Sequence, residues 1–290
     1  MTDPGLSAIM SERRQLINLA YRLLGSLAEA EDVVQETYVR WYAMSPERRE
    51  AVESVGGWLT RVAGRICLDV LGSARARRER YVGEWIPEPL PDRSGDPADR
   101  VTLDESVSMA FLVVLEAMTP AERVAFVLHD VFRYPFAEIA EIVGRTPAAC
   151  RQLAASARRR VRAGRAPAAP AARHADVVRD FRRAWQAGDI GALIGLLAPG
   201  VVATGDGGGF VSAALQPVEG ADPVARFFAD RAAAASGVTI SECTVNGRPG
   251  LVARQNGVPV SVMAFEVTDE GITHIWAVLN PDKLRLWAAA

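Results

Sequence analysis

Lysine is almost absent from this sequence. Of its 33 lysine and arginine residues, all but Lys283 are arginine. One explanation is a coding bias against lysine, which would leave a single lysine at an arbitrary, solvent-exposed position. The other is that this site requires a compact ammonium group, which the planar guanidinium of arginine does not replace. The two explanations differ in what Lys283 should contact.

Cysteine is also scarce, and Cys67, Cys150 and Cys243 lie far apart in the sequence. This spacing fits neither a disulfide framework nor a zinc site, so we expect reduced thiols and no bound metal or cofactor. No apolar run approaches the roughly twenty residues that a membrane-spanning helix needs. The first residues also lack the basic and apolar segments of a secretory signal. These absences predict a cytoplasmic protein with no membrane partner.

The formal net charge of −2 excludes a simple polycation, but it conceals a strong segregation of charge. Between Glu141 and Arg165 there are seven arginines and one acidic residue. Between Trp58 and Arg80 there are six arginines and two acidic residues. Basic stripes of this kind are typical of surfaces that contact a phosphate backbone. The alternative is that both stripes are solvated helix faces.

The 290 residues, 49% of them hydrophobic, are enough for more than one packed core. Helical periodicity dominates up to about residue 165 and is interrupted by a proline-rich stretch. After a short Ala/Pro tether, helices precede several strands separated by glycine, asparagine and proline turns. This order predicts an α+β fold with helices on one face of a curved antiparallel sheet. The expected divisions are 1–81, the linker 82–102, 103–165, the tether 166–173, and 174–290.

The stretch from Tyr134 to Arg162 has the pattern of a helix-turn-helix. Gly144 can adopt the positive φ that terminates a helix, and Thr146 is suited to cap the next one. In this motif the start of the second helix enters the major groove of DNA. Arginine suits guanine and glutamine suits adenine, so we expect Arg151 and Gln152 to read bases. An ordinary helical hairpin is the alternative. Further contacts are expected from Arg145 and Thr146 near the turn and from Arg158 and Arg159, which would hold phosphates.

The helix expected from about Leu27 to Tyr42 has two different faces. One is apolar and should be buried, whereas the other is mainly acidic. DNA would repel the acidic face, so it predicts a basic protein partner; the alternative is a solvated face. The apolar face comprises Ala30, Val33, Val34, Thr37 and Trp41, and the other face comprises Asp32, Gln35, Glu36 and Val39.

Three motifs occur in an order that resembles the sigma-70 family of bacterial transcription initiation factors. They are YRLLGSLAEAEDVVQETYVRW, then WLTRVAGRICLDVL, then the helix-turn-helix. The chain looks like the extracytoplasmic-function group of that family, which keeps only the sigma-2 and sigma-4 domains, over residues 8–165. The resemblance implies two all-α domains that bind core RNA polymerase and promoter DNA, and it implies a transcription factor and not an enzyme.

The resemblance also implies roles for individual residues. Asp32, Gln35 and Glu36 would face the clamp helices of the polymerase β′ subunit, within a core enzyme whose β subunit is a further partner. The helix around Arg151 would read the −35 promoter element. Many members have asparagine where Arg65 stands in this chain. The −10 element would be opened and read by the segment from Trp58 to Arg80, through Trp58, Arg61, Arg65, Arg75, Arg77 and Arg78.

Residues 174–290 resemble the SnoaL-like branch of the nuclear-transport-factor-2-like fold, a cone of helices and curved sheet around a pocket. Three motifs, GEWIPEPLP, DGGG and NPDKL, match those of extracytoplasmic-function sigma factors that carry such a domain. That subgroup usually has a lysine where Phe210 stands here. The resemblance implies that the domain regulates the sigma factor in cis. The expected regulatory contacts are Trp85, Pro87, Glu88, Pro89, Asp206, Gly207, Gly208, Gly209, Asn280, Pro281, Asp282 and Lys283.

We expect the DGGG and NPDKL loops to lie on the linker side of the SnoaL-like domain and to couple this domain to the sigma-2 and sigma-4 domains. Lys283 would then contact an acid such as Glu88 or Asp206, or a group of backbone carbonyls. The linker, stiffened by proline, presents Trp85 and Glu88 in a strip that should be pre-organised to lie across another surface.

An alternative function is a ligand-sensing or bifunctional regulator whose SnoaL-like pocket binds or transforms a small molecule. Catalysis in that pocket would need a general base, for which Asp206, Glu266 and His274 are candidates. Because a fold alone establishes no reaction, we expect no catalytic residue and treat the pocket as a possible ligand site.

Overall fold

The computed structural model describes residues 4–78, 81–92, 107–163, 169–211, 213, 216–234 and 237–288. The side chains of residues 4–11, 74–78 and 233–234 lie outside this description. The chain divides into two compact units, each described by itself below. The first unit is Met1–Glu79, Ser94–Thr102 and Phe111–Gly164, and the second is Arg80–Arg93, Leu103–Ala110 and Arg165–Ala290.

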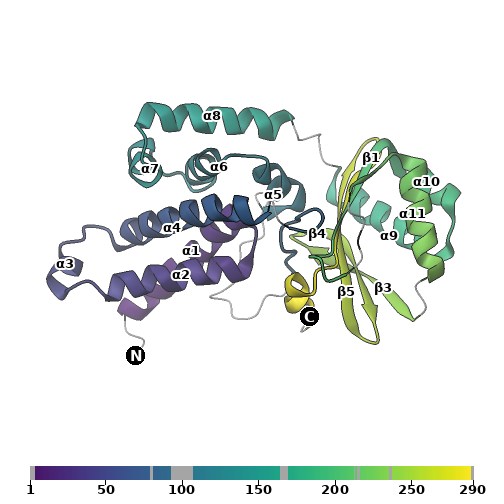
Figure 1. Ribbon diagram of the computed structural model, residues 1–290, viewed down its shortest axis with the longest axis horizontal. Helices are drawn as coiled ribbons and strands as arrows, with labels where there is room; N and C mark the ends of the chain where they lie inside the picture. The colour runs from purple at the N-terminus through teal and green to yellow at the C-terminus, as the bar shows by residue number, and fades with distance from the viewer. Residues whose placement is uncertain are drawn as a thin grey trace. The chain divides into compact units, whose positions relative to one another are not determined.

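The first unit is helical, as the periodicity of its sequence predicts (Figure 1). Leucines spaced three or four residues apart, such as Leu16, Leu19 and Leu23, are fully or almost fully buried. Its helices are α1 (Pro4–Leu24), α2 (Leu27–Tyr42), α3 (Pro46–Glu50), α4 (Val55–Arg78), α5 (Met109–Glu116, whose first two residues belong to the second unit), α6 (Pro120–Phe126), the π-helical turn η2 (Val127–Val131), α7 (Phe136–Val143) and α8 (Pro147–Ala163).

The predicted helix ends are present. The Ser26 hydroxyl accepts a hydrogen bond from the Glu29 amide at 3.4 Å and caps α2. Gly144 ends α7 with a φ of 67°, in the left-handed region that glycine tolerates best. The Thr146 hydroxyl then accepts from the Ala149 amide at 3.2 Å. The helix-turn-helix expected from the sequence is therefore formed by α7 and α8.

Polar side chains join the early and late helices of the first unit. The buried Arg123 guanidinium donates to the Leu23 carbonyl oxygen at 2.9 Å and lies 2.7 Å from the Glu116 carboxylate. Burial lowers the pKa of Arg123 to about 9, so it stays charged at neutral pH. The Tyr134 hydroxyl donates to Thr60 on α4 at 2.8 Å. The two helical groups thus pack as one body.

The second unit is built on a six-stranded sheet with strand order β2-β1-β6-β5-β4-β3. The strands β1 and β6 pair in parallel, and all other neighbours are antiparallel. The sheet is therefore mixed, which corrects the antiparallel sheet expected from the sequence. Its elements are α9 (Ala171–Ala187), α10 (Ile190–Leu196), β1 (Leu197–Asp206), β2 (Val218–Glu219), α11 (Ala221–Ala234), β3 (Val238–Val245), β4 (Arg248–Gln255), β5 (Val258–Thr268), β6 (Gly271–Val278) and the 3-10 helix η3 (Pro281–Ala288).

One face of this sheet packs against α9, α10 and α11 to form the main core (Figure 1). Because side chains alternate along a strand, Met263 and Phe265 of β5 face this core, whereas Glu266 faces the opposite side. In the described part of the chain, no helix is both long and apolar enough to cross a membrane.

Candidate functional sites

The acidic face of α2 is exposed, as its sequence pattern predicts. Asp32, Gln35 and Glu36 are exposed, while the opposite face of the helix is buried. Val39 and Tyr42 continue the exposed face and are 55% and 57% exposed. Exposed apolar side chains rimmed by polar and acidic ones fit the apolar centre and polar rim of a protein-binding surface.

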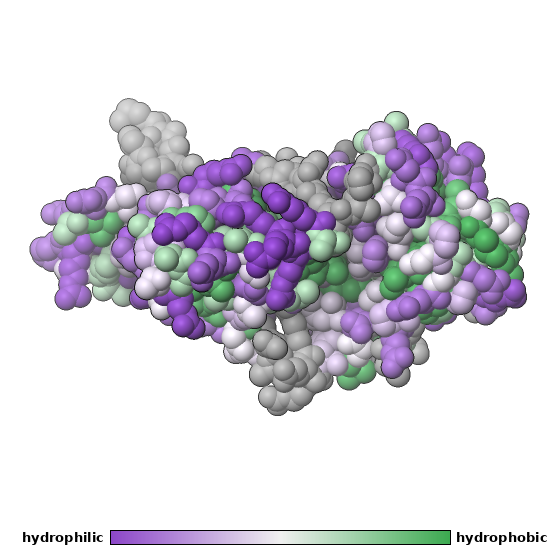
Figure 2. All heavy atoms as spheres, turned by 90° about the horizontal axis from the view of Figure 1, so that it is seen from above, coloured by the Kyte–Doolittle hydropathy of each residue, from purple (hydrophilic) through white to green (hydrophobic). Residues whose placement is uncertain are grey.

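The start of α8 is also exposed, with its polar side chains directed to solvent. Arg145, Thr146, Arg151 and Gln152 are all exposed. The Arg151 guanidinium lies 6.0 Å from the centroid of the Phe136 ring, at the outer range of a cation–π contact. Seen from above, the face of the first unit that carries α8 is mainly hydrophilic (Figure 2). This helix end is therefore accessible to a polyanion.

Arg158 and Arg159 differ in their surroundings, which the sequence did not indicate. Arg159 is exposed. Arg158 is half-buried, and its Nε donates to the Asp130 carboxylate at 2.6 Å. Adjacent residues on a helix point about 100° apart, so only one of the two faces away from the rest of the unit. Of this pair, Arg159 is the better placed to hold a phosphate.

The expected −10 residues on α4 pack against the helix-turn-helix. Arg61 lies 3.1 Å from the Glu141 carboxylate on α7, and Arg65 donates to the Glu141 carbonyl oxygen at 3.0 Å. Trp58 is half-buried, with its ring centroid 5.2 Å from that of Trp41. Two sets of expected DNA contacts are thus brought together within the first unit. The side chains of Arg75, Arg77 and Arg78 lie outside the described residues.

Asp206, at the end of β1, is fully buried and holds the proline-rich linker. Its carboxylate accepts hydrogen bonds from the Tyr81 hydroxyl at 2.6 Å and from the Ile86 amide at 3.0 Å. The Lys283 ammonium lies 2.7 Å from the same carboxylate and also donates to the Ile86 carbonyl oxygen. The Asn280 amide group donates to the Tyr81 hydroxyl at 2.9 Å. We refer to these five residues, Tyr81, Ile86, Asp206, Asn280 and Lys283, as the Asp206 cluster.

The DGGG and NPDKL loops therefore meet at the linker, within the second unit. The Asp206 carbonyl oxygen accepts the Asn280 backbone amide at 2.9 Å, and the Gly208 amide donates to the Asp206 carboxylate at 3.0 Å. Gly208 has a φ of 63°, and a Cβ atom there would overlap the Asn280 side chain. Glycine is thus required by both the backbone conformation and the close approach. Phe210 is 71% exposed.

Lys283 is mostly buried, with 11% of its side chain exposed. Its ammonium lies 4.1 Å from the centroid of the Trp85 ring. Burial, and then the hydrogen bond to Asp206, raise the pKa of Tyr81 far above its ordinary value, so its hydroxyl remains a donor. Trp85 is half-buried and Glu88 is buried. The described part of the linker is therefore largely buried, as expected of a strip that lies across another surface.

Asn246, in the turn between β3 and β4, holds two points of the chain that are far apart in sequence. Its Oδ1 accepts from the Leu90 amide at 2.9 Å, and its backbone amide donates to the Leu90 carbonyl oxygen at 2.9 Å. Its Nδ2 donates to the Val107 carbonyl oxygen at 2.8 Å. In addition, the Trp287 indole donates to the Pro89 carbonyl oxygen at 2.8 Å. Leu90 and Val107 are thereby held at the same side chain.

The second unit contains a large cavity between the sheet and α11, with a volume of about 600 Å³. Its walls are mainly apolar, and they include Trp185, Phe227 and Met263. The lining residues that the structure describes include no Asp, Glu, His, Cys, Tyr or Lys. Gly205 and Leu279, which precede Asp206 and Asn280, also form part of the wall.

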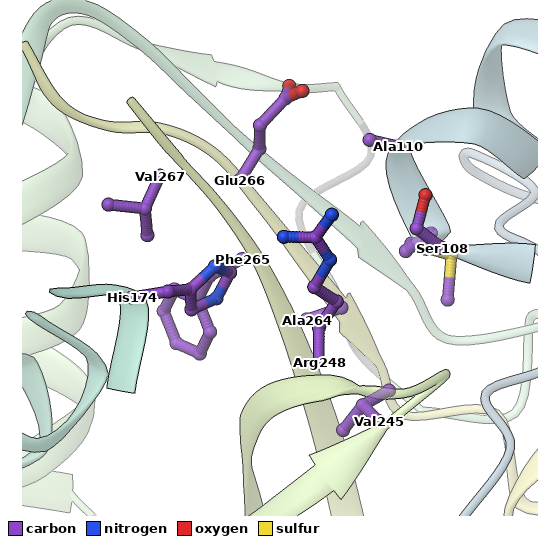
Figure 3. A pocket seen from close by; sticks show the side chains of 10 residues that line it. Ser108, Ala110, His174, Val245, Arg248, Ala264, Phe265, Glu266 and Val267 are labelled. Carbon is purple, nitrogen blue, oxygen red and sulfur yellow. The ribbon is translucent and has the colours of Figure 1, made fainter. Parts of the chain in front are cut away.

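A small second cavity lies beside β5 and the turn between β3 and β4, within the same unit (Figure 3). His174 comes from α9 and Ser108 from the segment before α5, with Arg248 between them. His174 is 2% exposed, and neither ring nitrogen makes a hydrogen bond of normal geometry, although the Pro249 carbonyl lies nearby. Burial first, and the charge of Arg248 second, lower the pKa of His174 to about 4.

The three candidate general bases do not converge on the large cavity. Asp206 is engaged with the linker. Glu266 lines the small cavity, and its carboxylate lies 3.0 Å from the His274 ring. Because Met263 and Ile275 of the same strands face the large cavity, alternation directs Glu266 and His274 to the opposite side. The geometry therefore gives no support to acid–base chemistry by these residues.

The comparisons with known proteins identify the family. Residues 8–78 match the family model of Sigma-70 region 2, and residues 108–161 match that of Sigma-70, region 4. The chain is 39% identical over 288 residues to the ECF RNA polymerase sigma factor SigJ of Mycobacterium tuberculosis, with 93% of this chain and 90% of that protein covered. The chain belongs to the extracytoplasmic-function RNA polymerase sigma factors.

Two further comparisons cover this sigma factor almost completely. The probable ECF RNA polymerase sigma factor SigI of Mycobacterium tuberculosis is 36% identical over 285 residues, covering 97% of this chain and 95% of that one. The crystal structure of Mycobacterium tuberculosis extracytoplasmic function sigma factor SigJ superimposes with a TM-score of 0.76 at 35% identity, covering 97% and 98% of the two chains. Both matches extend over the second unit, and the fold of the whole chain resembles that of the SigJ crystal structure.

Family membership gives the general function of the sigma factor. It acts in transcription initiation with core RNA polymerase on promoter DNA, and its region 4 contains the DNA-binding helix-turn-helix. The roles of its individual residues stay predictions. Tyr81, Asn246, Trp287 and Glu141 have no sequence signal that singles them out, because each acts through a partner distant in the chain.

Proposed function

We propose that this sigma factor binds core RNA polymerase through the acidic face of α2, at the clamp helices of the β′ subunit. The exposure of Asp32, Gln35 and Glu36 beside Val39 and Tyr42 carries this proposal. Apolar side chains supply contact area, and the carboxylates give charge complementarity to a basic partner.

The test is a binding titration of the full chain against core polymerase. The change Asp32→Arg with Glu36→Arg reverses two exposed charges and should abolish binding while leaving the helical circular dichroism signal intact. The matched control, Asp180→Arg with Glu270→Arg, reverses two exposed charges on the second unit and should bind normally. Equal affinity for both double variants would exclude this surface.

We further propose that the helical unit is closed as it stands and opens on promoters. The −35 and −10 elements lie about 25 base pairs apart, which is about 85 Å of duplex at 3.4 Å per base pair. Region 4 would read the first through α8, and region 2 would read the second through α4. Arg61 and Arg65 are instead bonded to Glu141 on α7. Both elements cannot be reached together while these contacts hold.

The length of the linker suggests how the second unit would regulate this opening in cis. Thirty residues separate the end of α4 from the start of α5, and they can reach about 100 Å when fully extended. Asn246 pins Leu90 and Val107 together, so residues 91–106 add almost nothing to that reach. The fourteen that remain span at most about 50 Å, so the pinned linker permits only about half the separation that a released linker would.

The corresponding experiment releases the loop at Asn246. Both Asn246 and Asn256 have a positive φ and precede a glycine, so Asn→Gly preserves the turn at either position. Asn246→Gly removes the two side-chain bonds to Leu90 and Val107 and should raise transcription from the cognate promoter without changing core binding. Asn256→Gly, at an exposed turn, is the control and should leave transcription unchanged. Identical transcription by both variants would contradict regulation through the tether.

A second candidate function is ligand sensing by the second unit. Helices on one face of a sheet that enclose a cavity of about 600 Å³ support a SnoaL-like assignment for this unit. The position of Gly205 and Leu279 in the cavity wall, next to the Asp206 cluster, favours a role in which a bound molecule acts on the linker.

A further inference from the structure

The large cavity has the composition of a binding site for an apolar molecule. A volume of about 600 Å³ with mainly hydrophobic and aromatic walls is in the range of small-molecule sites. Its described polar lining is confined to Thr204, Gln255, Ser261 and Arg231. Because no base is present to activate a hydroxyl among these residues, the site is suited to bind a molecule without transforming it.

Arg231 is the charged residue among the described lining residues. Its guanidinium carbon lies 3.5 Å from the centroid of the Phe227 ring, so the ring holds it at the cavity wall. Arg231 is exposed, so its guanidinium lies where the cavity wall meets solvent. Its hydrogen bond to the Phe227 carbonyl oxygen is long, at 3.5 Å, and the guanidinium has five N–H donors. An anionic group at this end of the cavity would therefore find an oriented cation.

We propose that this cavity binds a small apolar molecule that carries one carboxylate, with the apolar body against Trp185 and Met263 and the carboxylate at Arg231. This proposal specifies the ligand for the sensing function proposed above. Its biological effect rests on that function, whereas ligand binding itself does not. A carboxylate fits the planar fork of an arginine better than an alcohol does, so the ligand class is distinguishable from that of neutral lipids.

The cavity wall gives the bound molecule a path to the linker. Gly205 and Leu279 line the cavity, and the Asp206 carbonyl oxygen accepts the Leu279 amide at 2.7 Å. A ligand that contacts Gly205 and Leu279 would shift the backbone that orients the Asp206 carboxylate. That carboxylate accepts the Ile86 amide, so the hydrogen exchange rate of this amide reports whether the linker responds.

The binding experiment uses the full chain and the fluorescence of 1-anilinonaphthalene-8-sulfonate, an apolar anion, which dodecanoate or 1-dodecanol then displaces. The two competitors have the same chain length and differ in charge. Arg231→Gln should weaken dodecanoate about 10-fold or more and leave dodecanol nearly unchanged. Arg226→Gln, on the same helix but paired with Asp222 at the surface, is the control and should bind both competitors normally.

A cavity-filling variant locates the binding site. Ala277→Phe places a ring in the cavity and should abolish binding of all three compounds; Val260→Trp does the same from a neighbouring strand if the first variant fails to fold. Normal binding by a folded, filled variant would overturn the site. Equal weakening of dodecanoate and dodecanol by Arg231→Gln would overturn the carboxylate assignment.

The response of the linker is measured separately. With dodecanoate bound, hydrogen exchange at the Ile86 amide should change at least several-fold, while an amide in the core of the first unit should not change. Binding without any change at Ile86 would overturn the path to the linker. The Asn246→Gly experiment needs no ligand. Failure of the ligand proposal would therefore appear in the binding assays, and failure of cis regulation would appear in the transcription assay.

Discussion

Removing the ammonium of Lys283 should strongly destabilise the second unit. In Lys283→Met, the side chain keeps most of its length and apolar contacts but loses its charge. Asp206 is fully buried, so its carboxylate would remain in the interior without the cation that now lies 2.7 Å away. Breaking a buried pair on one side costs about 3–5 kcal/mol, because the remaining charge is not compensated.

The groups around Asp206 determine where in that range the loss of stability for Lys283→Met should fall. Three donors other than Lys283 stay on the carboxylate, namely the Tyr81 hydroxyl and the Ile86 and Gly208 amides. They stabilise the anion, so we expect a loss near the lower end, about 3 kcal/mol. Asp206→Asn should cost a similar amount because it leaves a mostly buried ammonium. The double variant should cost at least about 1 kcal/mol less than the sum of the two, as expected for residues in direct contact.

The assay is urea unfolding of the full chain, followed by circular dichroism and tryptophan fluorescence, with the second unit analysed as its own transition. The control is Arg285→Met, which breaks the exposed pair with Asp282 and should cost less than about 1 kcal/mol. Lys283→Arg tests geometry, since a larger guanidinium must enter the same buried site. Additive losses in the double variant, or a loss for Lys283→Met as small as that of the control, would refute the buried-pair reasoning.

Two other predictions follow from the described contacts. His174 has a pKa of about 4 in the folded state and about 6.5 in the unfolded state. As the pH drops from 6.5 to 4, the unfolded state therefore takes up a proton that the folded state does not. The free energy of unfolding should fall by up to about 3 kcal/mol over this pH range. In urea unfolding at several pH values, His174→Gln should lose most of this dependence and His274→Gln should keep it; parallel curves for wild type and His174→Gln would contradict the assignment. On promoter DNA, Arg151→Ala should cost about 1–3 kcal/mol and relax the preference at one base pair, whereas Arg159→Ala should weaken all sequences alike and reduce the salt dependence. Binding titrations on a panel of promoter variants distinguish these results, and uniform weakening by both changes would exclude base reading by Arg151.

The features that the sequence predicted best depend on local periodicity. In α2, the residues at helical spacing that were expected to be buried, including Ala30, Val34 and Trp41, are buried, and Asp32 and Glu36 are exposed. The turn at Gly144 was predictable for the same reason, because a left-handed φ and an N-cap need only adjacent residues. The conformations of these elements follow from residues close in sequence, and long-range packing did not change them.

The features that the sequence missed depend on partners far along the chain. The parallel pairing of β1 with β6 places Asp206 opposite Val278, and no rule based on neighbouring residues gives that pairing. Asn246 was visible only as a turn residue before a glycine, although its side chain reaches Leu90 and Val107. The cavity is formed by residues from several elements, each of which has the ordinary pattern of a core strand or helix.

The contacts of Lys283 decide between the two explanations for a single lysine. Coding bias predicts an exposed side chain at an arbitrary position, whereas this ammonium is mostly buried and joins Asp206, the Ile86 carbonyl and the Trp85 ring. Those partners surround a point charge from several directions, which a compact ammonium with three rotatable donors can satisfy and a planar fork cannot. Bias can explain why lysine is absent from the rest of the chain; the geometry of the Asp206 cluster explains why a lysine suits this position.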